Sequence, residues 1–390
     1  MSRTGIPLFD ADAAALLLQW YGDTARKLPW RESRAPYPVW VSEIMLQQTR
    51  VSAVIPYFER FMDALPCIRD LAEVPDERLM KLWEGLGYYS RARNLKKAAQ
   101  AVCEEHGGIF PSRHEDILRL PGIGSYTAGA IASICFGLPT PAVDGNVLRV
   151  FSRLYEIGAG SVLSDGGRGA AGSVPMDGGK GTAGSVPLGG GKGAAGSDAA
   201  VKRWIQNMLS ITYIDTPPAS RPDLTQALME LGALVCLPGA AANCPACPLS
   251  GMCLALRNGT VAELPVKAGK KPRREERRTV LLLCSDGKYA IRQRPEKGLL
   301  AELWEFPNLT GWLEEAEVLR MVADWGLQPL CARAAEGCRH VFTHIVWDMR
   351  CYYVACTERE DSFVWADAGE LSETYALPTA FRAVWGCSGR

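Results

Sequence analysis

Four cysteines lie close together in the sequence and have the side chain that binds soft metal centres. They are Cys236, Cys244, Cys247 and Cys253, which are separated by seven, two and five residues. Four thiolates within 18 residues indicate an iron–sulfur cluster or a zinc ion. Zinc sites usually offer two close pairs of ligands, whereas this set has one. The other nine of the 13 cysteines are scattered, and we interpret them as small buried hydrophobic residues.

A second group of residues combines a glycine turn with a carboxylate. The turn Leu120-Pro121-Gly122-Ile123-Gly124 precedes a helical pattern, so its N–H groups would face outward at a helix start, which suits phosphate binding without base preference. Asp144 follows Gly124 by twenty residues. The turn could equally be an ordinary connection between helices, and Asp144 could be an N-cap, a role compatible with a chemical one.

The elements that must position these residues are mostly helical up to about Leu154. Apolar spacing predicts helices at about 39–65, with Pro38 at the first helical position, and at 76–84, 90–106, 114–120, 125–136, 145–155, 199–209 and 224–235. Beyond Thr279 strands are predicted over 279–284, 289–294 and 340–356, with a helix over 314–324. The intervening Ser285-Asp286-Gly287-Lys288 is typical of a tight hairpin.

Composition sets the broad class. With 390 residues we expect two or three domains, and 47% hydrophobic and 22% charged residues are typical of a soluble globular protein. No apolar run suits a membrane span and no signal peptide is recognisable, so the expected location is cytoplasmic, associated with a bacterial-type nucleoid. The 43 basic and 43 acidic residues argue mildly against nucleic-acid binding, although a local basic face would suffice.

Two segments divide the chain. Residues 161–197 contain three 12-residue copies rich in Gly, Ser and Ala, which we interpret as a flexible insertion made by tandem duplication. Phosphate binding by its Gly-Gly-Lys-Gly elements lacks the strand and helix of a P-loop. Residues 265–278 are basic and predict a linker, either solvated or touching DNA phosphates. The expected organisation is a helical region over 1–264, this linker, and a separate α+β domain over 279–390.

The turn and Asp144 together resemble the helix-hairpin-helix DNA glycosylase superfamily. The resemblance implies that Asp144 stabilises, or captures covalently, the positive charge that develops on the sugar when a base leaves. Relatives such as endonuclease III that also cut the strand carry a lysine two residues after the second glycine. This chain has Tyr126 there, which implies a monofunctional enzyme because no imine can form at that position.

Two longer segments resemble MutY-type adenine DNA glycosylases: Val39–Thr49, preceded by Leu28-Pro29-Trp30-Arg31, and Gly85–Leu95. The resemblance assigns the general acid to Glu43, since a purine leaves more readily when protonated. A surface glutamate is the weaker interpretation, because Trp40 and Ile44 make a poor solvent face.

By the same resemblance, other residues contact DNA. Gln48 and Tyr88 would insert into the base stack and Leu46 would lie near the opposite base. The flipped adenine would lie in a pocket that includes Trp30, Arg31 and Glu230, although Trp30 and Tyr88 could also be core residues.

The remaining motifs fit the same family. Cys244, Cys247 and Cys253, with the preceding Leu231–Val235, resemble the 4Fe–4S domain of endonuclease III and MutY relatives, and one extra residue after Cys236 makes it the least certain ligand. Residues 298–307 resemble the Nudix-like module of MutY proteins. Residues 319–325 lack the paired glutamates that hold magnesium in Nudix hydrolases. The family's Phe-Ser-His lesion-sensing loop appears as Phe342-Thr343-His344.

The resemblance implies a two-lobed helix-hairpin-helix glycosylase, a six-helix lobe plus an iron–sulfur lobe, followed by an α+β Nudix-like domain. The expected reaction is hydrolysis of the N-glycosidic bond of adenine opposite 8-oxoguanine or guanine in double-stranded DNA, by a monomer with a 4Fe–4S cluster. Three alternatives stay open: a glycosylase/lyase for oxidised pyrimidines, a non-catalytic lesion-binding protein, and a nucleotide pyrophosphohydrolase.

Overall fold

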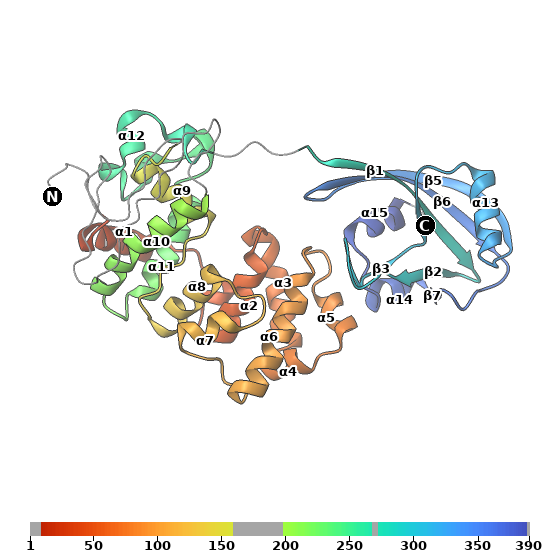
Figure 1. Cartoon of the computed structure of the whole chain (residues 1–390), viewed down its shortest axis with the longest axis horizontal. Helices are drawn as coiled ribbons and strands as arrows, with labels where there is room; N and C mark the ends of the chain where they lie inside the picture. Colours follow the sequence, from red (N-terminus) through yellow and green to blue (C-terminus); the bar gives the residue numbers. More distant parts are fainter. Residues whose placement is uncertain (1–8, 159–197, 267–271, 388–390) are drawn as a thin grey trace, which may run out of the picture. The chain divides into compact units, whose positions relative to one another are not determined.

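The computed structural model describes residues 9–158, 198–266 and 272–387 (Figure 1). The chain forms two compact units, each made of two separate stretches of sequence. Unit 1 comprises residues 1–48 and 101–269, and unit 2 comprises residues 49–100 and 270–390. The repeat insertion predicted over 161–197 lies outside the described residues.

Unit 1 is helical. Its α-helices are α1 (Ala11–Thr24), α2 (Pro36–Leu46), α7 (His114–Arg119), α8 (Ser125–Phe136), α9 (Gly145–Leu154), α10 (Asp198–Asp215), α11 (Arg221–Leu234) and α12 (Leu254–Asn258). Short 3-10 turns are η1 (Pro29–Arg31), η2 (Gly239–Ala241), η3 (Cys244–Ala246), η4 (Ser250–Met252) and η5 (Val261–Glu263). One hydrophobic core joins α1, α9, α10 and α11 around Leu17, Phe151 and Leu228.

Most helices follow the apolar periodicity closely. The helix predicted over 125–136 is α8, which ends because Gly137 adopts a left-handed φ of 63°. The helix predicted over 199–209 continues to Asp215.

The single helix predicted over 39–65 is wrong. The structure has α2, then a break, then α3 (Val51–Ala64). Gln48 in the break has a φ of 59°, which a continuing right-handed helix cannot accommodate. Pro36, and not Pro38, occupies the first helical position.

Unit 2 combines helices with a mixed sheet. The helices of its first stretch are α3, α4 (Ile68–Glu73), α5 (Asp76–Leu82) and α6 (Ser90–His106). The last turns of α6 belong to unit 1. The second stretch contains β1 (Arg274–Ser285), β2 (Lys288–Gln293), β3 (Trp304–Glu305), β4 (Asn308–Thr310), α13 (Glu315–Asp324), β5 (Pro329–Val341), β6 (Ile345–Cys356), β7 (Val364–Ala366), α14 (Ala368–Glu373) and α15 (Thr379–Cys387).

The sheet has the order β3-β2-β1-β6-β5, with β4 paired to β1 and β7 to β2. Alternation along β1 places Val280 and Leu282 against α14 and α15, and Leu281 and Leu283 against α13. Helices therefore cover both faces of the sheet (Figure 1).

Four details of this part of unit 2 test the sequence predictions. The predicted hairpin is confirmed, since Asp286 and Gly287 have φ angles of 47° and 72° between β1 and β2. The predicted linker is too long, because Arg274–Arg278 belongs to β1. The single strand predicted over 340–356 is wrong, because the chain reverses at Phe342–His344 between β5 and β6. The predicted helix over 314–324 is α13, with Glu314 as its cap.

No helix of residues 9–158, 198–266 or 272–387 is long and apolar enough to cross a membrane.

Candidate active site

Glu43 lies in α2 and is 7% exposed. Its Oε2 accepts a hydrogen bond of 2.7 Å from the Tyr126 hydroxyl of α8. The pKa of the Glu43 carboxyl is raised to about 7: burial is the largest cause, Asp144 also raises the pKa, and the Tyr126 hydrogen bond and Arg31 lower it. The carboxyl can therefore hold a proton near neutral pH.

Asp144 is the N-cap of α9. Its Oδ1 accepts from the Val147 backbone N–H at 2.7 Å, and its Oδ2 accepts from the Asn146 side-chain amide at 2.8 Å. Burial raises the pKa of the Asp144 carboxyl, while these hydrogen bonds and the Arg149 charge lower it. Donors that favour the ionised form, together with the positive end of the helix, suit a carboxylate facing a developing cation.

The two carboxyl groups influence each other, since Asp144 is one cause of the raised Glu43 pKa. Glu43 has one neutral donor, whereas Asp144 has several donors and a nearby cation. Burial raises the pKa of both carboxyls, but the donors and the cation at Asp144 favour its ionised form, so Glu43 is the better acid and Asp144 the better anion of the pair.

Glu230 of α11 is a different kind of buried acid. Its two carboxylate oxygens accept from Arg26 Nε at 2.8 Å and Arg26 Nη2 at 2.7 Å, and Arg31 Nη2 adds a bond of 2.9 Å. Burial alone would raise the pKa of Glu230, but the two arginines lower it to about 2. Glu230 thus holds Arg31 in place. Arg26 escaped the sequence analysis, and nothing in its local pattern singles it out.

The other predicted residues of unit 1 fall into two classes. Trp30 is buried in η1 and Leu46 is half-buried at the end of α2. Gln48, Gly122 and Gly124 are exposed. A Cβ at Gly124 would meet nothing within 4 Å, so packing within the chain does not require glycine there. Glycine would be required at this position if the backbone of another molecule approached closely.

A hydrogen-bonded chain runs from Asp144 to the cysteine segment. Asn146 donates to Asp144, Arg149 Nη2 donates to Asn146 Oδ1 at 2.9 Å, and Arg149 Nε donates to the Cys236 carbonyl at 2.7 Å. Gly232 permits this arrangement, because a Cβ there would lie 2.5 Å from the Asn146 Cβ. Asn146 and Arg149 were missed by the sequence analysis, although their i, i+3 spacing after Asp144 places them on one helix face.

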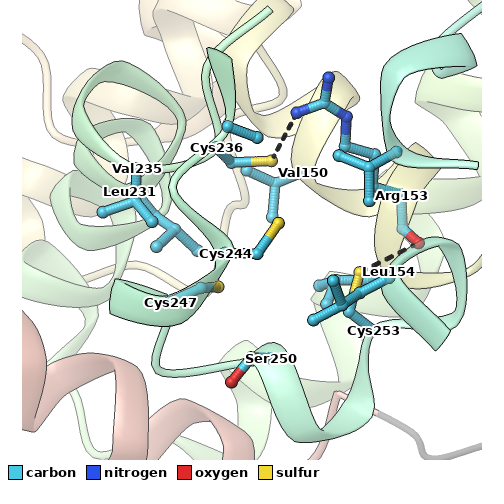
Figure 2. Close-up of a pocket in the computed structure, with 13 residues that line it drawn as sticks. Val150, Arg153, Leu154, Leu231, Val235, Cys236, Cys244, Cys247, Ser250 and Cys253 are labelled. Carbon is cyan, nitrogen blue, oxygen red and sulfur yellow. Dashed lines mark hydrogen bonds between the residues drawn. The ribbon is translucent and has the colours of Figure 1, made fainter. Parts of the chain in front are cut away.

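The four cysteines line one recess (Figure 2). Apolar side chains complete much of its wall, among them Val150, Leu154, Leu231 and Val235. Arg153 Nη1 donates to the Cys236 sulfur at 3.4 Å.

The chemistry of the recess bears on the kind of metal centre. Four thiolates can ligate an iron–sulfur cluster or a zinc ion. The apolar walls and the guanidinium also fit an anionic iron–sulfur group.

In unit 2, Tyr88, predicted to insert into the base stack, meets Thr343 of the predicted lesion-sensing loop. The Tyr88 and Thr343 hydroxyls lie 2.8 Å apart in a hydrogen bond, and Tyr88 is 44% exposed. Tyr88 has a φ of 46°. Arg91 holds the preceding turn by donating to the Leu86 and Gly87 carbonyls, each at 3.2 Å.

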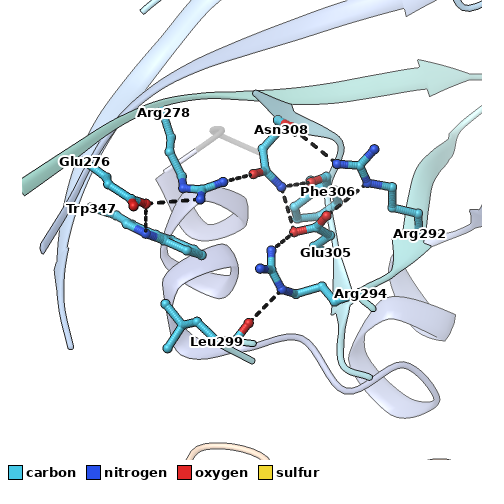
Figure 3. Close-up of polar contacts among 9 residues, drawn as sticks. All are labelled: Glu276, Arg278, Arg292, Arg294, Leu299, Glu305, Phe306, Asn308 and Trp347. Atoms are coloured by element: carbon cyan, nitrogen blue, oxygen red, sulfur yellow. Dashed lines mark hydrogen bonds and ion pairs between the residues drawn. The ribbon is translucent and has the colours of Figure 1, made fainter. Parts of the chain in front are cut away.

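The Phe342–His344 loop rests on Trp347. The Phe342 and Trp347 rings lie 4.9 Å apart in an edge-to-face contact, while Thr343 and His344 are exposed. A polar network also contacts Trp347 (Figure 3). The Arg278 guanidinium lies 4.3 Å from the Trp347 ring centroid, and Glu276 accepts from Trp347 Nε1 at 3.1 Å. The network continues through Arg292, Arg294, Glu305 and Asn308.

The helical hairpin beside a carboxylate pair defines the class of protein. The sequence profile of the HhH-GPD superfamily base excision DNA repair protein matches residues 41–161, and the NUDIX domain profile matches residues 278–386. The chain is a helix-hairpin-helix base excision DNA repair protein followed by a Nudix-like domain.

Similar proteins narrow this class. The adenine DNA glycosylase of Homo sapiens is 35% identical over 401 residues, covering 87% of this chain and 66% of the human protein. The adenine DNA glycosylase of Mus musculus is 34% identical over 435 residues, covering 94% of this chain and 76% of the mouse protein. The adenine DNA glycosylase of Buchnera aphidicola subsp. Acyrthosiphon pisum is 31% identical over 310 residues, covering 78% of this chain and 77% of the Buchnera protein. The chain belongs to the adenine DNA glycosylase family.

Proposed function

We propose that this chain is a monofunctional DNA glycosylase that hydrolyses the N-glycosidic bond of adenine mispaired with 8-oxoguanine or guanine. The observation that carries the proposal is the buried Glu43 carboxyl, with a pKa of about 7, near the hydrogen-bonded Asp144. One group can donate a proton to the leaving purine while the other faces the sugar.

In the proposed reaction, Glu43 protonates the adenine ring and makes it a better leaving group. The bond to the sugar then breaks, and positive charge develops on the deoxyribose. The Asp144 carboxylate stabilises that charge or captures it covalently, and water completes the hydrolysis. Tyr126 keeps Glu43 oriented through its 2.7 Å hydrogen bond.

The same site argues against strand cleavage at the hairpin. A lyase step needs a lysine amine to form an imine with the sugar. Tyr126 has no amine, and its hydroxyl is bonded to Glu43. This arrangement favours the monofunctional enzyme over a glycosylase/lyase for oxidised pyrimidines.

DNA contacts are proposed for the exposed turns. Gly122 and Gly124 offer backbone N–H groups to a phosphate, Gln48 enters the base stack and Leu46 lies near the opposite base. The flipped adenine lies against Trp30 and Arg31, with Glu230 fixing Arg31 from behind. We expect the protein to act as a monomer.

Recognition of 8-oxoguanine is proposed for the Phe342-Thr343-His344 loop, and insertion into the base stack for Tyr88. The support is the 2.8 Å Tyr88–Thr343 hydrogen bond, which joins the two candidate contact residues. A hydroxyl can donate to or accept from the oxidised base. The Thr343 methyl group adds bulk that the serine of the family's usual loop lacks.

We also propose that Cys236, Cys244, Cys247 and Cys253 hold a 4Fe–4S cluster. When bound, the cluster crosslinks and shapes the loop that follows α11. The cysteine-lined recess supports this assignment, and visible absorption with an iron assay would test it. Zinc without a visible band would contradict it.

The remaining alternatives have less support. A lesion-binding protein without activity would not need a proton donor tuned near neutral pH. A pyrophosphohydrolase needs several carboxylates for a magnesium ion, and no such group occurs in the part of the chain that the structure describes.

Single-turnover base release tests the proposal directly. Three duplexes would carry adenine opposite 8-oxoguanine, guanine or thymine. We expect fast release only from the first two, with strands breaking only after alkali. Release from none, or breakage without alkali, would contradict the proposal.

A further inference from the structure

Two cysteines face each other on the hairpin that carries the Phe342–His344 loop. Cys338 lies in β5 and Cys351 in β6, and both contribute to the core beneath α14 and α15. In the strand register Ala335 pairs with Cys351 and Cys338 pairs with Met349, so the two cysteines are diagonal neighbours. The side chains of diagonal neighbours point to the same face of an antiparallel pair.

A β-bulge brings the strands close at this point. The register shifts between Ala335 and Cys338, and a Cβ on the intervening Gly337 would lie 2.6 Å from the Met349 carbonyl oxygen. Only glycine allows this approach. The Cys338 and Cys351 side chains are joined by a hydrogen bond, so the thiols are already in contact.

The environment of Cys338 suits reaction. Cys338 is partly exposed, whereas Cys351 is 2% exposed. The hydrogen bond with Cys351 lowers the pKa of Cys338, whereas burial raises the pKa of Cys356 on the same sheet to about 11. Because the thiolate is the nucleophile, an accessible thiol with a lowered pKa reacts first with an electrophile.

We propose that Cys338 and Cys351 form a reversible disulfide when the protein meets a small organic disulfide such as oxidised glutathione. The Cys338 thiolate attacks one sulfur of the oxidant, forming a mixed disulfide and releasing one glutathione thiolate. The Cys351 sulfur, after losing its proton, attacks the Cys338 sulfur and releases the second glutathione. The two protein thiols lose two electrons, glutathione disulfide gains them, and the two thiol protons end on the two released glutathiones.

The bond closes a loop of the 12 residues from Arg339 to Arg350, which contains Phe342–His344 at its tip. Crosslinking a short hairpin restricts its conformations. If this loop recognises 8-oxoguanine as proposed, formation of the disulfide changes the ratio of adenine release opposite 8-oxoguanine to adenine release opposite guanine.

The chemical test does not depend on activity. The full chain with its metal centre is reduced, treated with oxidised glutathione without oxygen, alkylated and digested with trypsin. We expect Ala334–Arg339 joined to Cys351–Arg359 through Cys338 and Cys351, and separated again by dithiothreitol. Fragmentation, or the variant Cys356→Ser, distinguishes Cys351 from Cys356 in the second peptide.

Variants sharpen the result. Cys338→Ser should abolish the linked peptides, and Cys351→Ala should trap glutathione on Cys338. Cys331→Ser, at an exposed cysteine of the same strand, should leave the link intact. Circular dichroism checks that each variant folds. Stable glutathione on wild-type Cys338, or a link through another cysteine, would overturn the proposal. If the link forms and the release ratio is unchanged, the disulfide stands and the reading role of the loop is wrong.

Discussion

Two buried glutamates of unit 1 have opposite chemistry. Glu43 is 7% exposed and Glu230 is 1% exposed, so burial opposes ionisation of both. The neutral Tyr126 hydroxyl cannot offset burial at Glu43, and the pKa rises to about 7. Two guanidinium groups at Glu230 more than offset it, and the pKa falls to about 2. The two guanidinium groups keep Glu230 ionised, whereas Glu43, with a neutral donor, can give up a proton at neutral pH.

The largest expected effect is on the Glu43 side of this comparison. Glu43→Gln removes the proposed proton donor while keeping the shape of the side chain. We expect single-turnover adenine release to fall about 1000-fold, within the range for general acid catalysis. Glu59→Gln, at an exposed position of α3, is the control and should leave the rate unchanged. Full activity in Glu43→Gln would remove the acid assignment.

The next effect concerns Glu230. Glu230→Gln leaves Arg26 and Arg31 facing a neutral amide, and we expect the free energy of unfolding to fall by about 3 kcal/mol. The control is Asp223→Asn on the same helix, which breaks a 2.9 Å pair with Arg34 between half-exposed side chains. Such surface pairs contribute less than about 1 kcal/mol. Chemical denaturation at pH 7 measures both. Equal losses of unfolding free energy in Glu230→Gln and Asp223→Asn would contradict the expected difference between the buried and the surface ion pair.

The pH dependence of stability separates the two acids further. Because the folded-state pKa of Glu43 is raised, its contribution is fully present below about 4.5 and declines as pH rises through about 7. The folded-state pKa of Glu230 is lowered, so its contribution is present above about 4.5 and is lost as pH falls toward 2. Each change amounts to about 3 kcal/mol.

Denaturation curves across pH, compared between wild type and each Glu→Gln variant, measure these contributions. Parallel pH curves for wild type and Glu43→Gln between pH 4.5 and 7 would show that the Glu43 pKa is not raised.

A smaller effect tests the packing beside Asp144. Gly232→Ala places a methyl group against Asn146, and overpacking of this kind costs about 2 kcal/mol of stability. Adenine release should slow as well, since Asn146 holds Asp144. Gly22→Ala in α1 is the control, because a Cβ there meets nothing within 4 Å. Thermal unfolding of both variants measures the difference, and an unchanged Gly232→Ala protein would show that α11 can move away freely.

The smallest effect concerns Tyr126. Its hydrogen bond lowers the pKa of Glu43, so Tyr126→Phe should raise that pKa and extend adenine release to higher pH, by about one unit or less. Tyr213→Phe removes a buried hydroxyl bonded to Thr225, away from the carboxylates, and serves as the control. A shift toward lower pH in Tyr126→Phe would contradict the assigned role of the hydrogen bond.

The local sequence pattern predicted much of the fold. Apolar spacing predicted α8 over 125–136 and α6 over 90–106, and Asp286-Gly287 predicted the turn between β1 and β2. The failures have local causes. Gln48 interrupts a helical pattern that apolar spacing alone continues. The pairing of β5 with β6 hides a reversal at Phe342–His344 inside one β-prone run.

The sequence by itself determined which residue types were available: the four closely spaced cysteines, Glu43, Asp144, and a tyrosine in place of lysine at position 126. These depend only on identity and spacing along the chain. Tertiary structure decided their states. Arg26 reaches Glu230 from 204 positions away, and Gly232 lets α11 approach Asn146. Electrostatic energies depend on distance in space and on exposure to water, which only the folded chain defines.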